Sequence, residues 1–345
     1  MGGDVDSFMA TMVARSRIPI ASAIALARDC YGLETRAVRL TGERDENFKL
    51  SIADGTEYVL KIANAAEEQA VGELLTAALQ HVERADPTFP CPRVVPARDG
   101  RACVRFVDAS GAERSARLLT YLPGRLLGAT SRSRWQRAAC GRIAGRLSNA
   151  LRSFEHPAAR RVIVWDVRHA AQVRALLAQL PDRPYREAAD DVLGRVAPRI
   201  ESRLPRLRRQ VVHNDLNPRN ILVDPADEAR VTGIIDFGDM TYTALIADVA
   251  VTAAELLPED CTAGESARES IRDVALAYHE AVPLLEEELS MLGSLVAARL
   301  AANVVVPDWH MHRNPSGDHY AVLDPHFIRA RLQIAQELLL EEIRL

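Results

Sequence analysis

The sequence predicts an α+β fold of two lobes, with a small β-rich N-terminal lobe and a larger helical C-terminal lobe. Apolar and polar residues tend to alternate in the first third of the 345-residue chain, as they do in strands with one buried face. Beyond that, apolar positions recur every three or four residues, as in helices, around one embedded pair of strands. Pro123 and Gly124 separate the two patterns, so we expect lobes at 1–122 and 123–345.

The N-terminal lobe is expected to hold a leading helix, a sheet and one further helix. The leading helix, at 16–32, ends at Gly32, a residue that commonly terminates helices. Asp54 and Gly55 separate two strand-like runs and predict a hairpin. The expected strands are 38–40, 48–52, 58–62, 92–96, 102–107 and 116–122, and the second helix is 65–82.

The C-terminal lobe is expected to be helical apart from the segment 211–223, in which two short apolar runs flank a polar loop, and the apolar run 231–235 that follows after a short turn. Pro198 and Pro205 are expected to interrupt the third helix. The expected helices are 135–154, 170–180, 185–209, 247–257, 267–281, 286–305 and 326–343.

Composition limits the classes of function. The chain is 48% apolar, enough for a substantial core, and its net charge of −4 shows no basic excess for nucleic acid or an anionic membrane. No window holds about 18 uninterrupted apolar residues, which disfavours a membrane span. Five scattered cysteines without a CxxC pair favour free thiols in a reducing cytoplasm, so we expect a cytoplasmic protein.

Three oxygen-bearing side chains follow or precede the apolar runs of the C-terminal lobe. Asp215 and Asn220 lie in the polar loop between the apolar residues 211–212 and 221–223. Asp236 directly follows the apolar run 231–235. Phosphoryl transfer needs a carboxylate to orient the attacking hydroxyl and oxygen ligands that hold magnesium on the nucleotide phosphates. Asp215 is the candidate base, and Asn220 and Asp236 are the candidate metal ligands. The alternative is an Asx-rich surface turn that satisfies its own backbone.

Two neighbours of this set are expected to support it. His213 lies two residues before Asp215 and is expected to brace the loop. Asp239 follows the metal aspartate and either reaches a second metal ion or caps the turn.

A lysine in an apolar strand predicts a phosphate-binding cation in the N-terminal lobe. Lys61 has apolar neighbours on both sides, and we expect a carboxylate to hold it. Glu73, within the apolar-striped part of the next helix, is the chosen partner, and Glu67 and Glu68 are alternatives. A solvent-facing edge lysine is the competing interpretation.

A glycine-rich phosphate loop is absent from the sequence. The segment 41–48 stands in its place, and Arg44 and Asn47 are candidate donors to the nucleotide phosphates. The alternative is a solvated hairpin of charged residues.

The motifs HNDLNPRN (213–220) and IDFGD (235–239) resemble those of the aminoglycoside phosphotransferase and choline kinase-like family, relatives of the protein kinases. More narrowly, ERDENF (43–48), YVLKI (58–62) and DFGDM (236–240) resemble the hydroxylysine kinases and their bacterial relatives. The chain departs from typical members at Asn214, where glycine is commoner.

The resemblance implies a bilobal protein-kinase-like fold and a kinase that uses ATP or GTP. It implies that the backbone of 119–122, including Thr120, Tyr121 and Leu122, meets the nucleotide base. It assigns Lys61 to the α- and β-phosphates, Asp215 as base, and Asn220 and Asp236 to Mg²⁺.

The acceptor is expected to be a small amine-bearing molecule in the helical lobe. An ammonium and a carboxylate would need an acidic group and an arginine. The candidates for binding the acceptor are Asp239, Trp165, Asp166, Tyr242 and Arg299. The structural alternatives are a place in the core for Trp165, a turn cap for Asp239 and a surface ion pair for Arg299.

The sequence therefore predicts a small-molecule kinase acting on a hydroxylated amino acid that resembles hydroxylysine. An aminoglycoside or an amino alcohol of homoserine or choline type is the alternative acceptor. Two other classes remain as rivals: a nucleotide-binding pseudokinase, disfavoured because lysine, base and metal ligands are all present, and a protein kinase. The oligomeric state stays open.

Overall fold

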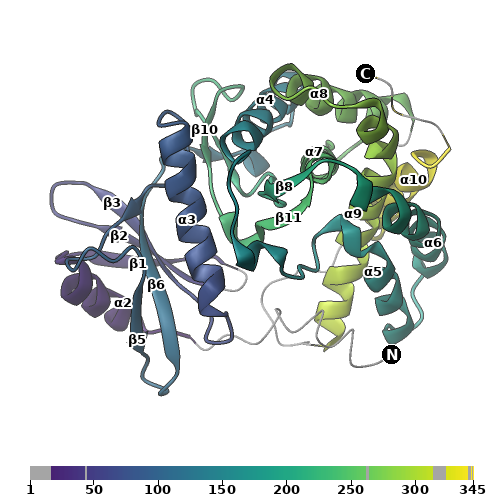
Figure 1. Ribbon diagram of the computed structural model, residues 1–345. Coiled ribbons are helices and arrows are strands. Elements are labelled where there is room, and N and C mark those ends of the chain that lie inside the picture. The colour runs from purple at the N-terminus through teal and green to yellow at the C-terminus, as the bar shows by residue number, and fades with distance from the viewer. Residues whose placement is uncertain (1–16, 43–44, 262–263, 314–323, 341–342, 344) are drawn as a thin grey trace. The chain divides into compact units, whose positions relative to one another are not determined.

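The computed structural model describes residues 17–42, 45–261, 264–313, 324–340, 343 and 345 (Figure 1). The chain forms two compact units, one extending to Pro123 and taking in His156–Ala159, the other comprising Gly124–Glu155 and the chain from Arg160 onward. The N-terminal unit is built on a sheet and the other is mainly helical, which confirms the predicted α+β class.

The N-terminal unit contains a six-stranded antiparallel sheet in the order β1-β2-β3-β6-β4, with β5 paired to β6. Its core is formed where alternate strand residues turn inward, and Phe48, Leu50, Leu60 and Ile62 are completely buried. The strands are β1 Arg36–Leu40, β2 Glu46–Ser51, β3 Glu57–Ile62, β4 Val94–Val95, β5 Val104–Val107 and β6 Glu113–Thr120.

Two helices complete this unit. Helix α2 (Ile20–Leu26) continues as one π-helical segment (Ala27–Tyr31) and ends at Gly32, which has a φ of 72°. Helix α3 (Gln69–Ala85) contacts β4 and β6 with its apolar stripe. Gly32 is the predicted terminator, because only a residue without a Cβ adopts this backbone readily.

The second unit contains helices and two small sheets. The sheet β10-β9-β7 holds the predicted hairpin, and β11 pairs with β8. The strands are β7 Arg125–Leu126, β8 Arg209–Val212, β9 Ile221–Val223, β10 Val231–Ile234 and β11 Thr241–Ala244. The helices are α4 Arg134–Ala150, α5 Ala170–Leu176, α6 Arg186–Arg203, α7 Leu245–Glu255, α8 Glu265–Ala281, α9 Glu286–Arg313 and α10 Pro325–Glu337.

Helix α9 is longer than the sequence pattern predicts, because it continues through Pro307 to Arg313. Among the described residues, this one helix is long and apolar enough to cross a membrane, but 83% of its apolar window is buried inside the protein. Core helices of soluble proteins meet the same criterion, so its length and composition are weak evidence for a membrane span.

Helices α4 and α8 approach closely where α4 carries glycines. A Cβ built on Gly141 would lie 2.2 Å from the carbonyl oxygen of Val274, and one on Gly145 would lie 2.9 Å from the Cβ of Ala281. The glycines therefore set the distance between the two helices.

Gly141→Ala is expected to lower the free energy of unfolding by about 1–3 kcal/mol, because the new methyl group forces the two helices apart. Urea denaturation followed by circular dichroism measures the change. Gly194→Ala in α6 is the matched control: its Cβ would meet only the guanidinium end of Arg174, at 3.0–3.2 Å. A Gly141 variant as stable as this control would contradict the packing argument.

Candidate active site

The loop between β8 and β9 is anchored by a completely buried histidine. The Nε2 of His213 lies 3.2 Å from the carbonyl oxygen of Ile235, and because a carbonyl only accepts, Nε2 is the donor. Its ring packs edge-on against Phe237, with centroids 4.8 Å apart. The backbone N–H of Asp215 donates to Nδ1 at 3.3 Å. These contacts fit the expected bracing role.

The next residue bends the loop. Asn214 has a φ of 64°, a left-handed conformation that asparagine adopts more readily than most residues. This explains how asparagine stands where glycine is commoner. Its backbone N–H donates to Oδ1 of Asp248 on α7 at 2.7 Å. Asp248 is 3% exposed, so a buried carboxylate fixes the backbone of the loop.

Burial raises the pKa of Asp248 to about 6, although hydrogen bonds from the backbone of Asn214 and His213 oppose the shift. A folded-state pKa above the unfolded value means that this group stabilises the fold fully below about pH 4. That contribution is lost as the pH rises through about 6. At one pKa unit per 1.36 kcal/mol, the loss amounts to roughly 3 kcal/mol.

Asp248→Asn is therefore expected to remove a fall of up to roughly 3 kcal/mol in the free energy of unfolding between pH 4 and 6.5. Burial lowers the pKa of His169 to about 4, which gives an opposite slope in the same range. This slope is common to both proteins and cancels in their difference. Urea titrations at several pH values measure the difference in the free energy of unfolding between wild type and Asp248→Asn. The control is Asp182→Asn, at an exposed position. Parallel pH curves for wild type and Asp248→Asn would contradict this account.

Asp215 and Asn220 are in direct contact. Nδ2 of Asn220 donates to Oδ2 of Asp215 at 2.6 Å and to its backbone carbonyl at 2.9 Å. Oδ1 of Asp215 accepts from Asn217 at 2.9 Å and from Arg299 at 3.2 Å. The Asp215 side chain is still 20% exposed. It is a fixed carboxylate that solvent, and hence a hydroxyl group, can reach.

Strand pairing brings the second acidic motif to the same loop. The backbone N–H of Ile235 donates to the carbonyl of Asn220 at 2.9 Å, in line with the pairing of Ile221 with Ile234. Asp236 follows directly, with a φ of 58° and an exposed side chain. Asn220 and Asp236 thus leave neighbouring strands at the same end.

The donor atoms fit a magnesium ion that is shared with a nucleotide. Both protons of the Asn220 amide are used on Asp215, so its Oδ1 remains as an oxygen ligand, and Asp236 adds a carboxylate. No group of three or more acidic, histidine or cysteine side chains gathers for a metal among the described residues. Mg²⁺ characteristically takes one or two protein oxygens and completes its shell with phosphates and water.

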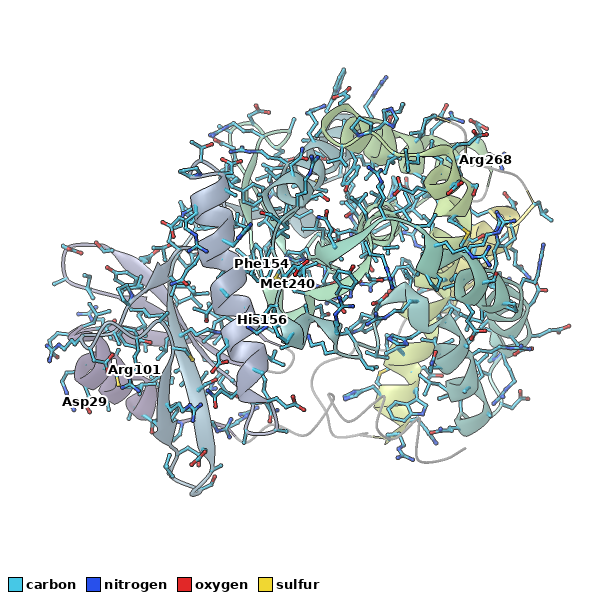
Figure 2. The ribbon with its side chains drawn as sticks, in the orientation of Figure 1. Asp29, Arg101, Phe154, His156, Met240 and Arg268 are labelled. Atoms are coloured by element: carbon cyan, nitrogen blue, oxygen red, sulfur yellow. The ribbon has the colours of Figure 1, made fainter. Side chains whose placement is uncertain are left out.

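Asp239 belongs to the same site. It ends a short 3-10 helix (Phe237–Asp239) and is 5% exposed. This helix is held by Arg161, which donates to the carbonyl of Gly238 and, at 3.1 Å, to that of the fully buried Met240, labelled in Figure 2. Burial and the charges of Asp239 and Glu255 raise the pKa of Asp215 well above its usual value, against Arg299 and Asn217. The charge of Asp239 therefore acts on the candidate base.

Arg299 is a structural partner of Asp215, and the prediction that it binds the acceptor is wrong. Its Nε donates to Oε1 of Glu255 at 2.8 Å and one terminal nitrogen donates to the carbonyl of Trp165 at 2.9 Å. The other terminal nitrogen holds Asp215, and the guanidinium lies 5.0 Å from the centroid of the Trp165 ring. Each of its three nitrogens is engaged within a 3% exposed side chain.

Glu255 is the residue that the sequence prediction missed. It ends α7, is 18% exposed, and accepts at Oε1 from both Arg299 and, at 2.9 Å, Asn303. Burial alone would raise the pKa of Glu255, but the charge and hydrogen bond of Arg299, the bond from Asn303 and the charge of Arg219 lower it below its usual value. The sequence places Arg299 and Asn303 four residues apart, on one face of a helix. This spacing does not indicate that both side chains donate to Glu255.

Two other predicted acceptor residues have different surroundings. Asp166 is 1% exposed and accepts from the N–H of Arg168 at 3.0 Å and from Thr243 at 3.2 Å, so the prediction that it meets an acceptor is wrong. Tyr242 packs under the guanidinium groups of Arg160 and Arg209, 4.2 and 5.5 Å from its ring centroid. Within the described chain it forms no hydrogen bond with Asp215. Trp165, in contrast, is joined to the site through Arg299.

In the N-terminal unit, Lys61 lies on β3 with a 13% exposed side chain. Its Nζ is 3.9 Å from a carboxylate oxygen of Asp45, which is also 3.9 Å from a nitrogen of Arg117. Asn47 pairs with Lys61 across β2 and β3 and is 8% exposed. These mostly buried polar groups lie on β2, on β3 and just before β2, which fits the predicted cation better than a solvent-facing edge lysine does.

The expectation that Glu73 faces the sheet is wrong. Glu73 is exposed and accepts a hydrogen bond from Gln69, one turn earlier. It lies two positions from Val71 and Leu75 on the apolar stripe, which is about 200° around the helix. Glu67, one of the two alternatives, has a buried carboxylate oxygen. Arg44 lies outside the described residues.

The predicted base-binding segment begins inside the sheet. The backbone N–H groups of Thr120 and Tyr121 donate to the carbonyls of Arg93 and Glu57, at 2.9 and 3.2 Å. Leu122 follows the end of β6 and has no hydrogen bond within the described chain. Its N–H is thus the one backbone donor of Thr120, Tyr121 and Leu122 that remains available to a ligand.

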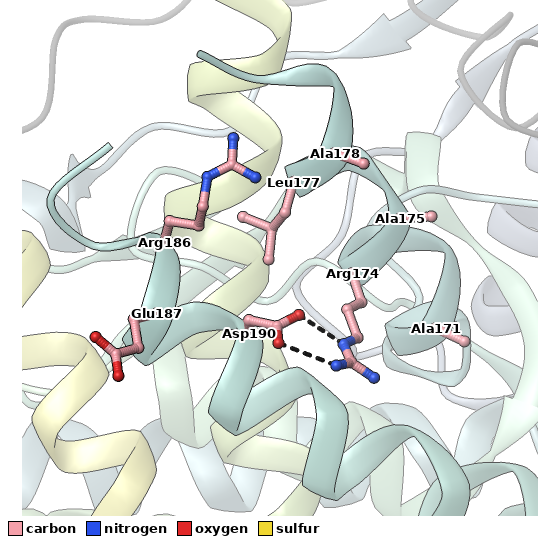
Figure 3. A pocket seen from close by; sticks show the side chains of 8 residues that line it. All are labelled: Ala171, Arg174, Ala175, Leu177, Ala178, Arg186, Glu187 and Asp190. Carbon is pink, nitrogen blue, oxygen red and sulfur yellow. Dashed lines mark hydrogen bonds and ion pairs between the residues drawn. The ribbon is translucent and has the colours of Figure 1, made fainter. Parts of the chain in front are cut away.

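A hollow in the described surface lies apart from these residues (Figure 3). It measures about 600 Å³, and a paired Arg174 and Asp190 face each other at 2.7 Å across it. Both side chains are nearly half exposed, and none of the candidate active-site residues described above lines the hollow. Its lining residues are Ala171, Arg174, Ala175, Leu177, Ala178, Arg186, Glu187 and Asp190.

Comparison with known proteins identifies relatives over most of the chain. The model of a family described as "Phosphotransferase enzyme family" matches residues 36–284. A hydroxylysine kinase of Mus musculus is 27% identical over 326 residues, which cover 88% of this chain and 85% of that protein.

Solved structures share the fold. An amicoumacin kinase in complex with AMP-PNP and Ca²⁺ has a TM-score of 0.70 at 14% identity, covering 98% of this chain and 96% of the other. A microcompartment-associated aminopropanol kinase has a TM-score of 0.64 at 19% identity, covering 93% and 95%. The protein-kinase-like fold predicted from the motifs is thereby confirmed.

Proposed function

Because this chain belongs to the phosphotransferase enzyme family, we propose that it transfers the γ-phosphoryl group of ATP or GTP, with Mg²⁺, to a hydroxyl of a small amine-bearing molecule. The favoured acceptor is a hydroxylated amino acid that resembles hydroxylysine, in line with the hydroxylysine kinase of Mus musculus. An amino alcohol or an aminoglycoside is the alternative.

One observation carries this proposal: the Asp215 carboxylate is fixed by Asn220, Asn217 and Arg299 and still reaches solvent. A carboxylate in this setting orients an acceptor hydroxyl and takes its proton as phosphoryl transfer proceeds. Its pKa is raised, which strengthens it as a base when ionised. Structural support by His213 and Asp248 keeps the carboxylate in place.

The remaining roles follow from the donor atoms. Asn220 and Asp236 would hold Mg²⁺, which when bound neutralises charge on the nucleotide phosphates. Lys61, next to Asn47 and Asp45, would contact the phosphates. The free N–H of Leu122 would meet the base. Both predicted roles of Asp239 stay open: it either reaches a second metal ion or caps the turn.

A screen for mass gain tests the proposal. The purified chain is incubated with ATP or GTP, Mg²⁺ and a panel that includes hydroxylysine, homoserine, choline, aminopropanol and an aminoglycoside. We expect one panel member to gain the mass of a phosphoryl group, with hydroxylysine the best acceptor. Transfer only to polypeptide would support a protein kinase, and nucleotide binding without transfer to any acceptor would support a pseudokinase.

A further inference from the structure

The proposed active site contains a carboxylate whose partners leave one oxygen unused. Glu255 accepts two hydrogen bonds at Oε1, from Arg299 and Asn303, and none at Oε2 from the described residues. Two donors on one oxygen fix the side chain without covering it, since 18% of it remains exposed. A fixed, ionised and accessible carboxylate is a binding group for a cation.

The other acidic groups of the site are already engaged. Asp215 uses both carboxylate oxygens and is the proposed base. Asp166 is buried and accepts hydrogen bonds from Arg168 and Thr243, and the Asp239 side chain is only 5% exposed. Glu255 is therefore the accessible carboxylate that neither the fold nor the proposed chemistry uses in full.

Arg299 fixes the position of Glu255 relative to the base. Nε of its guanidinium holds Glu255, and a neighbouring nitrogen holds Asp215. The two carboxylates thus lie at adjacent positions on one rigid planar group. A cation on Glu255 and a hydroxyl on Asp215 can then belong to one small molecule with its amine close to its hydroxyl.

We propose that Glu255 binds the ammonium group of the acceptor and thereby selects amines over neutral alcohols. This inference rests on the proposed function and assigns the amine specificity to a residue outside the family's sequence motifs quoted above. It also replaces the earlier expectation that Arg299 takes an acceptor carboxylate, since the nitrogens of Arg299 hold Asp215, Glu255 and Trp165.

The test pairs a change in the protein with the same change in the acceptor. Hydroxylysine and aminopropanol are assayed beside their N-acetylated forms, hydroxylysine being acetylated at both of its amines, so that each form keeps the hydroxyl and loses its ammonium charge. For wild type we expect N-acetylation to lower kcat/KM about 10–100-fold, the worth of a hydrogen bond to a charged group. For Glu255→Gln we expect a similar loss on the free amines, mainly in KM, and little further loss on N-acetylation.

This comparison distinguishes binding of the acceptor ammonium by Glu255 from a role in which Glu255 only positions Arg299. If Glu255 only positioned Arg299, Glu255→Gln would lower kcat/KM equally for free and acetylated acceptors, and an unchanged preference for the free amine would overturn the inference. A wild type indifferent to N-acetylation would overturn it as well. Failure of wild type to phosphorylate any panel member would instead overturn the proposed function, and the inference with it.

Two further variants keep the result interpretable. Glu255→Asp retains the charge on a shorter side chain and is expected to keep part of the amine preference, which gives a second measurement should Glu255→Gln not fold. Glu280→Gln, at an exposed position of α8, is the matched control and is expected to behave as wild type. Near-ultraviolet circular dichroism checks the fold of each protein. Loss of the preference in Glu255→Asp and Glu280→Gln alike would contradict a specific role for Glu255.

Discussion

Asp215→Asn is expected to lower kcat for phosphoryl transfer by about 10²–10⁴-fold, the usual contribution of a positioned general base. An amide has nearly the shape of the carboxylate but cannot take the proton of the acceptor hydroxyl. The nucleotide is bound by other groups in the proposed mechanism, so its affinity is expected to change little.

The measurement combines initial rates with hydroxylysine and nucleotide binding by calorimetry. Asp227→Asn, an exposed aspartate in the turn between β9 and β10, is the matched control and should retain wild-type rates. Because Asn217, Asn220 and Arg299 all donate to Asp215, thermal unfolding of the variant must also be followed. Equal turnover by the Asp215 variant and wild type would remove the proposed base from the mechanism.

The parts of the site that the sequence predicts correctly are close together in the chain. Asp215 and Asn220 are five residues apart in one loop, and Asp236 follows the next strand of a hairpin whose pairing is local. Short spacing and strand ends determine where such side chains lie, so pattern and chemistry sufficed to bring them together.

The surroundings of the base required the folded structure. Arg299 and Glu255 are 44 positions apart, and Arg299 and Asp215 are 84 apart, and the packing of α7 against α9 places Arg299 beside Glu255. The sequence identified an arginine of suitable chemistry and assigned it to the acceptor, because nothing in the chain indicates which carboxylates will satisfy it. Asp166 was misassigned for the same reason.

Errors in local structure have simpler causes. Glu73 lies within an apolar-striped segment, but a difference of two positions turns it to the solvent side of α3. Strand β11 is four residues long and α7 begins at the next residue. The stretch is too short to show the alternation of apolar and polar residues that predicts a strand. Its partner β8 comes from before the catalytic loop, a pairing that local pattern does not reveal.

Asp236→Asn is expected to lower kcat/KM by about 10²–10⁴-fold and to raise the Mg²⁺ concentration needed for half-maximal rate, since a metal ion contributes several kcal/mol of charge stabilisation. Asparagine is the informative substitution because Asp236 has a φ of 58°, which asparagine tolerates and alanine does not. The fold and the hydrogen bond from Gly238 are therefore expected to persist, so that the lost charge is the main change.

Rates over a range of Mg²⁺ concentrations, with nucleotide affinity measured with and without Mg²⁺, give the test. The variant is expected to bind nucleotide alone about as well as wild type and to gain less affinity from Mg²⁺. Asp260→Asn, at an exposed position after α7, controls for the loss of one negative charge. An unchanged Mg²⁺ dependence would show that Asp236 is not a metal ligand, and Asn220, which shares the strand ends with it, would then lose its assignment too.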